Sequence, residues 1–257
     1  AGGPLRRGRA DWFFAWEQHE RHDPAVARAN EPEVFFAAPS APTLTALEAR
    51  IAGSTSPLLQ GCAAGTGGFG STAQAACAYT AVLSQLSGML GKVPRAMRQT
   101  IVFPRIDLHL NARNQVTLQY NSMRRTAPFG ALGGATETNS MGSFGDSSTS
   151  DDAAVGRWEF FAMPHLASSL RYQYSRDVLS QVPGKESPFE QSLANNFYGL
   201  PPQVSIDHSA GFAFGTRTTV NKPKYPAETR QQLMEAMTWI HEKQAMRFGY
   251  DYNHVVD

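Results

Sequence analysis

The feature that most constrains this chain is a strict alternation of apolar and polar side chains within residues 99–123. Ile106, Leu108 and Leu110 fall on one parity, and polar residues separate them. After a polar break at residues 111–114 the alternation resumes with the same regularity. A period of two over this length predicts two antiparallel strands that are joined by a tight turn.

Two classes of antiparallel sheet show such a pattern. A soluble sandwich buries its apolar face and leaves its polar face in water. A strand of an outer-membrane barrel places lipid on one face and a wet interior on the other. The alternation therefore predicts an all-β antiparallel fold and leaves both classes open.

The pattern recurs in a strand at residues 11–18 and in two further hairpins, at residues 155–179 and 232–256. Together these segments predict about eight strands in an up-and-down meander of hairpins. We predict that large aromatic residues of these strands face lipid or a core rather than a stacked sugar: Trp12, Phe14, Trp16, Trp158, Phe160 and Trp239. We predict that the opposite parity faces a polar lumen, with the following residues: Arg105, Asp107, His109, Gln119, Arg171, Arg247 and Asp251.

The lengths of the connections favour the membrane alternative. Short predicted turns alternate with long predicted excursions along the chain. The turns lie near residues 6–9, 112–114, 163–166 and 242–244, and the excursions cover residues 19–98, 124–152 and 180–229. Short turns on one side and long loops on the other are typical of a transmembrane β-barrel with extracellular loops. We therefore predict one partial barrel domain over residues 1–257, with loops that are partly helical, at residues 43–52 and 75–90.

Cys62 and Cys77 enclose a segment rich in Gly, Ala, Ser and Thr. A disulfide across this segment requires an oxidising compartment such as the cell surface. Two unpaired thiols in a cytosolic loop are the alternative. We predict the disulfide, and the absence of a CxxC motif or a His/Cys cluster argues against zinc.

The overall charge excludes a class of partner. The chain carries 23 Lys+Arg and 22 Asp+Glu, a net charge of +1. This balance provides no electrostatic footprint for nucleic acid.

Three Asp–His combinations are candidates for catalysis: Asp107 with His109, Asp207 with His208, and Asp251 with His254. A catalytic pair also needs a nucleophile and an oxyanion site, and no G-x-S-x-G turn supplies them. We predict that the chain is not an enzyme and binds no cofactor.

Two further motifs are weak. The acids Asp146, Asp151 and Asp152 lack the spacing of an EF-hand, so we predict an exposed loop rather than a calcium site. The glycine-rich run at residues 65–70 lacks the GK[ST] of a phosphate-binding loop.

Several of these segments also resemble a known family. The sequence GGPLRRGRADWFFAWE resembles the first barrel hairpin of TonB-dependent outer-membrane receptors. Three more segments resemble the Oar-like branch of that family: IVFPRIDLHLNARNQVTLQYN, ANNFYGLPPQV and TWIHEKQAMRFGYDYNHV. The resemblance covers nearly the whole chain and is weakest around the two cysteines.

The resemblance implies a receptor in the cell outer membrane that contacts lipid, captures a small ligand with its surface loops and imports it. Uptake in that family is driven by a TonB-type energy-coupling partner, which acts through N-terminal plug and TonB-box segments. This chain shows neither segment, and its strands are fewer than the roughly 22 of a plugged barrel. We therefore expect a fragment of a receptor whose open sheet edges favour self-association. Iron chelates, cobalamin, oligosaccharides and peptides all stay open as ligands, and a soluble all-β binding or hydrolytic domain is the alternative function.

Overall fold

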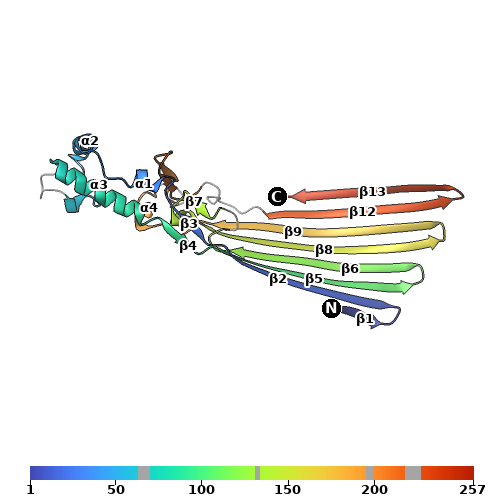
Figure 1. Ribbon diagram of the computed structural model, residues 1–257. Coiled ribbons are helices and arrows are strands. Elements are labelled where there is room, and N and C mark those ends of the chain that lie inside the picture. The colour runs from blue at the N-terminus through green and yellow to red at the C-terminus, as the bar shows by residue number, and fades with distance from the viewer. Residues whose placement is uncertain (63–69, 131–133, 195–198, 218–226) are drawn as a thin grey trace.

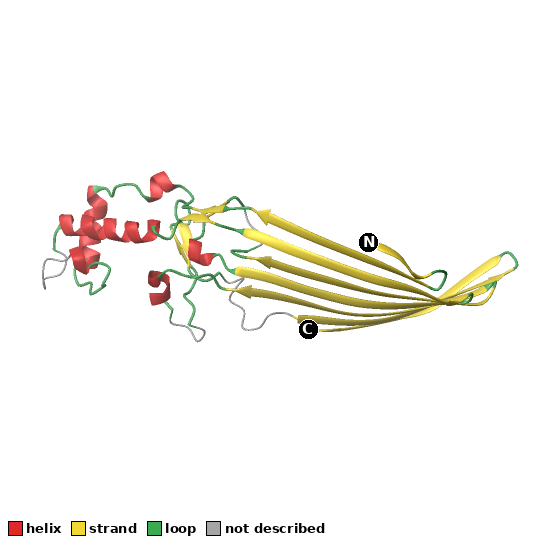
Figure 2. Cartoon of the chain, turned by 90° about the horizontal axis from the view of Figure 1, so that it is seen from below, coloured by secondary structure: helices red, strands yellow, loops and turns green. Residues whose placement is uncertain are grey.

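A computed structural model describes residues 1–62, 70–130, 134–194, 199–217 and 227–257. The chain forms one long antiparallel sheet with a smaller body of helices and short strands at one end (Figure 1). Both views show this body beyond the same end of the strands (Figure 2).

The sheet has eight strands, and their order in the sheet follows their order in the chain. All neighbouring strands are antiparallel. The strands are β1 (Gly2–Arg6), β2 (Ala10–His22), β5 (Ala96–Asn111), β6 (Asn114–Ala127), β8 (Asp146–Met163), β9 (Leu166–Val182), β12 (Ala227–His241) and β13 (Gln244–Val256). The predicted fold class, an antiparallel meander of hairpins, is confirmed.

Connections of two lengths alternate along the sheet. Tight turns at residues 7–9, 112–113, 164–165 and 242–243 join strands at one end, close to the predicted positions. The connections β2–β5, β6–β8 and β9–β12 all leave from the other end. Each strand of the sheet from β2 to β12 therefore has a tight turn at one end and a long excursion at the other.

The excursions carry the remaining elements. The helices are α1 (Pro32–Phe35), α2 (Ala41–Ile51), α3 (Thr72–Ser87) and α4 (Pro188–Ser192), with short 3₁₀ turns η1 (Gln60–Cys62) and η2 (Met141–Ser143). The short strands are β3 (Ala25–Ala27), β4 (Gly91–Val93), β7 (Thr136–Glu137), β10 (Val204–Ile206) and β11 (Phe212–Phe214). Among the described helices, none combines the length and apolar character needed to cross a membrane.

Serine caps explain where the longer helices begin. Ser40 accepts a hydrogen bond from the Thr43 backbone at the start of α2, and Ser71 accepts one from Gln74 at the start of α3. A capping serine satisfies an N–H group that has no partner inside the helix. Both helices lie where the Ala/Leu-rich segments predicted them.

The predicted loop boundaries were too wide. Strand β6 continues to Ala127 and β8 begins at Asp146, so residues 124–127 and 146–152 belong to strands rather than to the loop. The excursions predicted at residues 19–98 and 180–229 also begin and end inside strands. The segment DSSTSDD has no apolar alternation, but strands β6 and β9 on either side hydrogen-bond its backbone. Pairing of the backbone therefore extends the sheet beyond the part that the side-chain pattern marks.

Candidate functional site

The strand register sorts the side chains of the sheet onto two faces. Residues directly opposite one another on antiparallel strands share a face. One row crosses seven strands and consists almost entirely of apolar and aromatic residues: Trp12, Ile106, Leu118, Gly156, Tyr172, Leu233 and Tyr252. We call the side of the sheet that carries this row the apolar face.

Large side chains of the apolar face lie exposed. Trp16 is 58% exposed, Leu118 49%, Phe248 51% and Tyr250 60%. The six aromatic residues predicted to face lipid or a core all have the parity of this face. An apolar surface that runs across a whole sheet is far larger than the patches that soluble monomers expose.

A second row, one residue along each strand, belongs to the opposite side of the sheet, which we call the polar face. It consists of Asp11, Asp107, Thr117, Arg157, Arg171, Met234 and Asp251. The seven residues predicted to face a lumen all share this face, because they have the same parity in the register. The alternation in the sequence therefore corresponds to two chemically different surfaces.

Polar-face side chains bind one another along and across strands. Asp107 accepts hydrogen bonds from Arg105 at 2.9 Å and from Thr117 at 2.7 Å. Arg157 and Arg171 are directly opposite in the register, and like charges in this position repel. Each of them turns to a polar partner on its own strand: Arg157 binds Glu159, and Arg171 donates to Gln173 at 2.6 Å.

The long excursions assemble into one structure, which we call the loop body. Strand β3 from the first excursion pairs with β7 from the second. The Asn30 backbone of the first excursion donates to Gly211 of the third at 2.8 Å, and Ser140 of the second donates to Ala213 of the third at 2.8 Å. Segments far apart in sequence therefore hold one another in place.

A small apolar core lies inside the loop body. Leu86 and Met89 from the first excursion pack with Phe212 and Phe214 from the third, and each is no more than 5% exposed. A neighbouring cluster joins Ala27 and Val93 of the first excursion to Phe144 of the second. The loop body thus has a hydrophobic core of its own, built by all three excursions.

A buried carboxylate fastens the second excursion to the third. Glu190 of α4 is 1% exposed, and its Oε1 accepts hydrogen bonds from the Ser140 hydroxyl at 2.7 Å and from the Gly215 backbone at 3.0 Å. Its Oε2 accepts from the Ser187 backbone at 2.6 Å. A buried carboxylate is stable only when such donors surround it. Glu190 is therefore a structural residue of the loop body.

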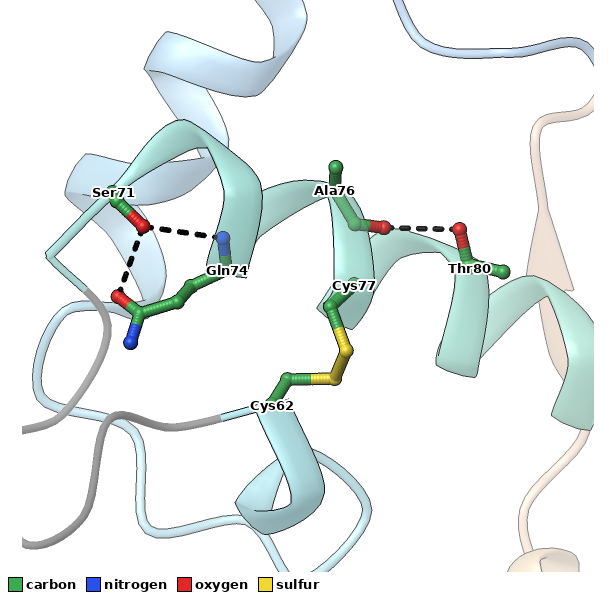
Figure 3. Close-up of a disulfide and its surroundings, with 6 residues drawn as sticks. All are labelled: Cys62, Ser71, Gln74, Ala76, Cys77 and Thr80. Carbon is green, nitrogen blue, oxygen red and sulfur yellow. Dashed lines mark hydrogen bonds between the residues drawn. A yellow bond between two sulfur atoms is a disulfide. The ribbon is translucent and has the colours of Figure 1, made fainter.

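Cys62 and Cys77 form a disulfide that ties η1 to α3 (Figure 3). Ser71 caps the same helix a little before Cys77, and the Thr80 hydroxyl donates to the Ala76 carbonyl just after it. The disulfide lies in the loop body, on the side of the sheet opposite the tight turns.

The Asp–His candidates do not form pairs in the described structure. Asp107 binds Arg105 and Thr117, while the acid nearest His109 is Asp11, at 3.6 Å. Asp207 accepts from the Ser209 hydroxyl at 2.8 Å. Asp251 and His254 are three positions apart, so the two side chains point to opposite faces of β13.

The acidic candidates for calcium are also apart. Asp151 and Asp152 are adjacent on β8 and so face opposite sides of the sheet, and Asp146 accepts from the Phe129 backbone. Within the described residues no group of three or more His, Cys, Asp or Glu is placed to hold a metal ion. The glycine-rich run lies outside the described residues except for Gly70.

Two structural residues were missed in the sequence. Glu190 follows Ser187 by three positions, and this S-x-x-E spacing is the signature of a capping box, which the structure contains. Arg95 is 4% exposed and donates to the Asp23 carbonyl at 3.0 Å and to the Gly134 carbonyl at 3.2 Å. No local motif marks Arg95, because its partners come from two different excursions.

The sheet geometry agrees with a comparison against protein families. The family described as "Outer membrane beta barrel domain" matches residues 1–257. This chain belongs to that family. No curated protein and no solved structure matches the chain.

Family membership indicates what surrounds the two faces and the two ends of the sheet. The protein is located in the cell outer membrane. In such barrels an outward apolar band meets lipid, short turns lie in the periplasm and long loops lie outside the cell. A soluble all-β domain does not agree with this location. The lumenal position of the seven polar-face residues and the TonB-dependent branch stay predictions.

Proposed function

We propose that this chain is part of an outer-membrane receptor that captures a small ligand outside the cell and imports it. The loop body would bind the ligand, and the barrel interior would pass it inward. The observation that carries the proposal is the loop body itself, in which two neighbouring apolar clusters join the first excursion to the third and to the second. Loops that are long and yet ordered are usually functional, and a rigid surface binds a ligand at a lower entropic cost than separate flexible loops.

The polar face supports the same proposal. It offers guanidinium and carboxylate groups along the sheet, including Arg105, Arg171 and Asp107. Charged side chains inside a membrane protein normally face a water-filled path and mark the route of a solute. The resemblance to TonB-dependent receptors implies the driving force for uptake. In that family an energy-coupling partner acts on an N-terminal part of the full-length protein.

We further propose that the chain is not an enzyme. The support is that the Asp and His candidates bind other partners or face opposite sides of a strand. Catalysis would need a nucleophile, a base and an oxyanion site that converge on one position.

Uptake in the native host tests the proposal. Ala27 and Gly91 are directly paired in β3 and β4, so a two-residue turn can replace residues 28–90 and leave both strands joined. Strains with the full-length gene deleted, restored or shortened in this way are compared for uptake of labelled iron chelates, cobalamin, oligosaccharides and peptides. We expect uptake of one ligand class to be lost on deletion, restored by the full-length gene and not restored by the shortened gene.

Two controls complete this test. A Gly-Ser insertion after Lys243, in a tight turn at the other end of the sheet, should leave uptake unchanged. The quantity of each variant in the outer membrane is measured, so that poor assembly is not mistaken for lost binding. Uptake that persists without the gene, or that a protonophore does not reduce, contradicts the proposal.

A further inference from the structure

The apolar face contains a hollow where two small residues lie between large ones. Ala154 and Gly156 of β8 are flanked by Tyr172 and Tyr174 of β9 on one side. The other side of the hollow is formed by Leu118, Tyr120, Pro104 and Ile106 from β6 and β5. The hollow has a volume of ≈ 450 Å³.

The space around Gly156 is large enough for a side chain. A Cβ placed on Gly156 would meet Leu118 Cδ2 at 3.6 Å, which is an ordinary contact, so backbone geometry does not demand glycine here. The space is therefore open to an apolar occupant. It covers two rows of side chains, roughly 7 Å along the strands, and four strands, roughly 14 Å across them.

An apolar hollow in a membrane does not by itself select a ligand. Lipid tails already surround the apolar face, so packing of a chain there gains little hydrophobic free energy. Selectivity must come from polar groups at the edge of the hollow. Charged groups of this kind lie on the edge toward the loop body.

Toward the loop body, the next row of the same face is charged. Asp152 lies two residues from Ala154, and its two carboxylate oxygens accept hydrogen bonds from Nη2 of Arg124, at 2.9 and 2.7 Å. The Tyr120 hydroxyl also donates to Asp152 Oδ1. Arg176 is directly opposite Asp152 in the register and is exposed. Among the described residues Arg176 makes no ion pair. Two arginines and one aspartate leave this edge with a net positive charge.

The charged edge lies on the side of the long loops, which in this family is the outer leaflet. We propose that the hollow and the charged edge bind one anionic, phosphate-bearing lipid of the outer leaflet. An acyl chain lies between Tyr172 and Leu118, and the phosphate accepts hydrogen bonds from Arg124 and Arg176. Guanidinium groups suit phosphate because they donate two parallel hydrogen bonds. This inference rests on the outer-membrane location and does not depend on uptake.

Native mass spectrometry of the full chain in detergent micelles tests the inference. The probes are diphosphoryl lipid A, a zwitterionic phosphatidylcholine with saturated chains of the same length, and inorganic phosphate. We expect a one-to-one complex with lipid A and neither of the other two probes to be retained. Arg176→Gln breaks no side-chain hydrogen bond or ion pair among the described residues and should weaken retention about tenfold, as expected for one lost charge-assisted hydrogen-bonding group.

Filling the hollow tests the acyl chain separately. Ala154→Leu should abolish the complex, whereas Ala153→Leu changes the adjacent residue of β8 on the polar face and should not. Arg247→Gln on the polar face is the matched control for the loss of an arginine. Equal retention of phosphatidylcholine, equal binding of phosphate alone, or retention unchanged by both Arg176→Gln and Ala154→Leu would each overturn the inference.

Discussion

The sheet and the loop body bury their apolar residues in opposite ways. In the sheet, large residues such as Phe248 and Leu118 are about half exposed, and antiparallel backbone pairing connects every strand to its neighbours. In the loop body, Phe212 and Phe214 are 3% exposed and pack with residues from other excursions. The two regions have similar aromatic side chains in very different surroundings.

This difference in exposure follows from the solvent around each region. The loop body lies in water, so burial of its core stabilises it by the hydrophobic effect. Lipid covers the apolar face of the sheet. The backbone hydrogen bonds between strands are essential there, because lipid cannot hydrogen-bond unpaired N–H and C=O groups. Mutations of the same kind should therefore have different consequences in the two regions.

Truncating a phenylalanine should show the largest contrast. Phe212→Ala leaves a cavity in the loop-body core, and we expect it to lower the free energy of unfolding of this region by about 4 kcal/mol. Phe248→Ala on the apolar face should cost far less, because lipid fills the space. Hydrogen exchange in micelles measures both effects. Equal losses of protection in the two regions would contradict the contrast.

Breaking the disulfide should affect only the loop body. Cys62 and Cys77 are 15 positions apart, and their disulfide restricts the unfolded chain. Replacing both with serine removes this restriction, and we expect the free energy of unfolding of the loop body to fall by about 3 kcal/mol. Protease sensitivity should rise around α3, while the pairing of β5 with β6 should be unaffected. Mass spectrometry of unreduced digests provides the control, because it recovers the linked peptides only from the unmodified chain.

A charge on the apolar face should disturb the sheet more than the same charge on the polar face. Leu118→Arg places a cation against lipid, and we expect it to destabilise the folded state in vesicles by about 2 kcal/mol. Gln119→Arg introduces the same side chain one residue along the strand and should have a much smaller effect. Urea titrations in lipid vesicles compare the two variants. A larger loss for Gln119→Arg would reverse our assignment of the faces.

The smallest expected effect is a pH dependence in the loop body. The Ser209 hydroxyl, followed by the Ala210 backbone N–H, holds the pKa of Asp207 below its usual value. The folded state therefore gains stability from Asp207 above its unfolded pKa, about 4 for an aspartate, and loses that gain as the pH falls through the folded pKa. Titration followed by NMR should show a depressed Asp207 pKa that Ser209→Ala restores. An unchanged pKa in that variant would contradict this cause.

Local patterns in the amino-acid sequence are enough to predict the sheet. Alternation in residues 99–123 specified two strands, a turn and two faces, because a period of two sends neighbouring side chains to opposite sides of a strand. The same reasoning located the other tight turns and placed Asp107 and Leu118 on opposite sides. It also found α2 and α3, whose compositions and serine caps are local signals.

The remaining features depend on contacts between residues that are distant in the chain. The core around Phe212 forms only when the first and third excursions meet, and no local pattern encodes contacts between residues so far apart in the chain. The ends of β6 and β8 depend on backbone pairing rather than on side chains, so a pattern of side chains could not find them. The hollow beside Gly156 likewise depends on which residues of β6 and β9 the register places next to it. Register and long-range packing therefore converted an alternating sequence into a surface with distinct sites.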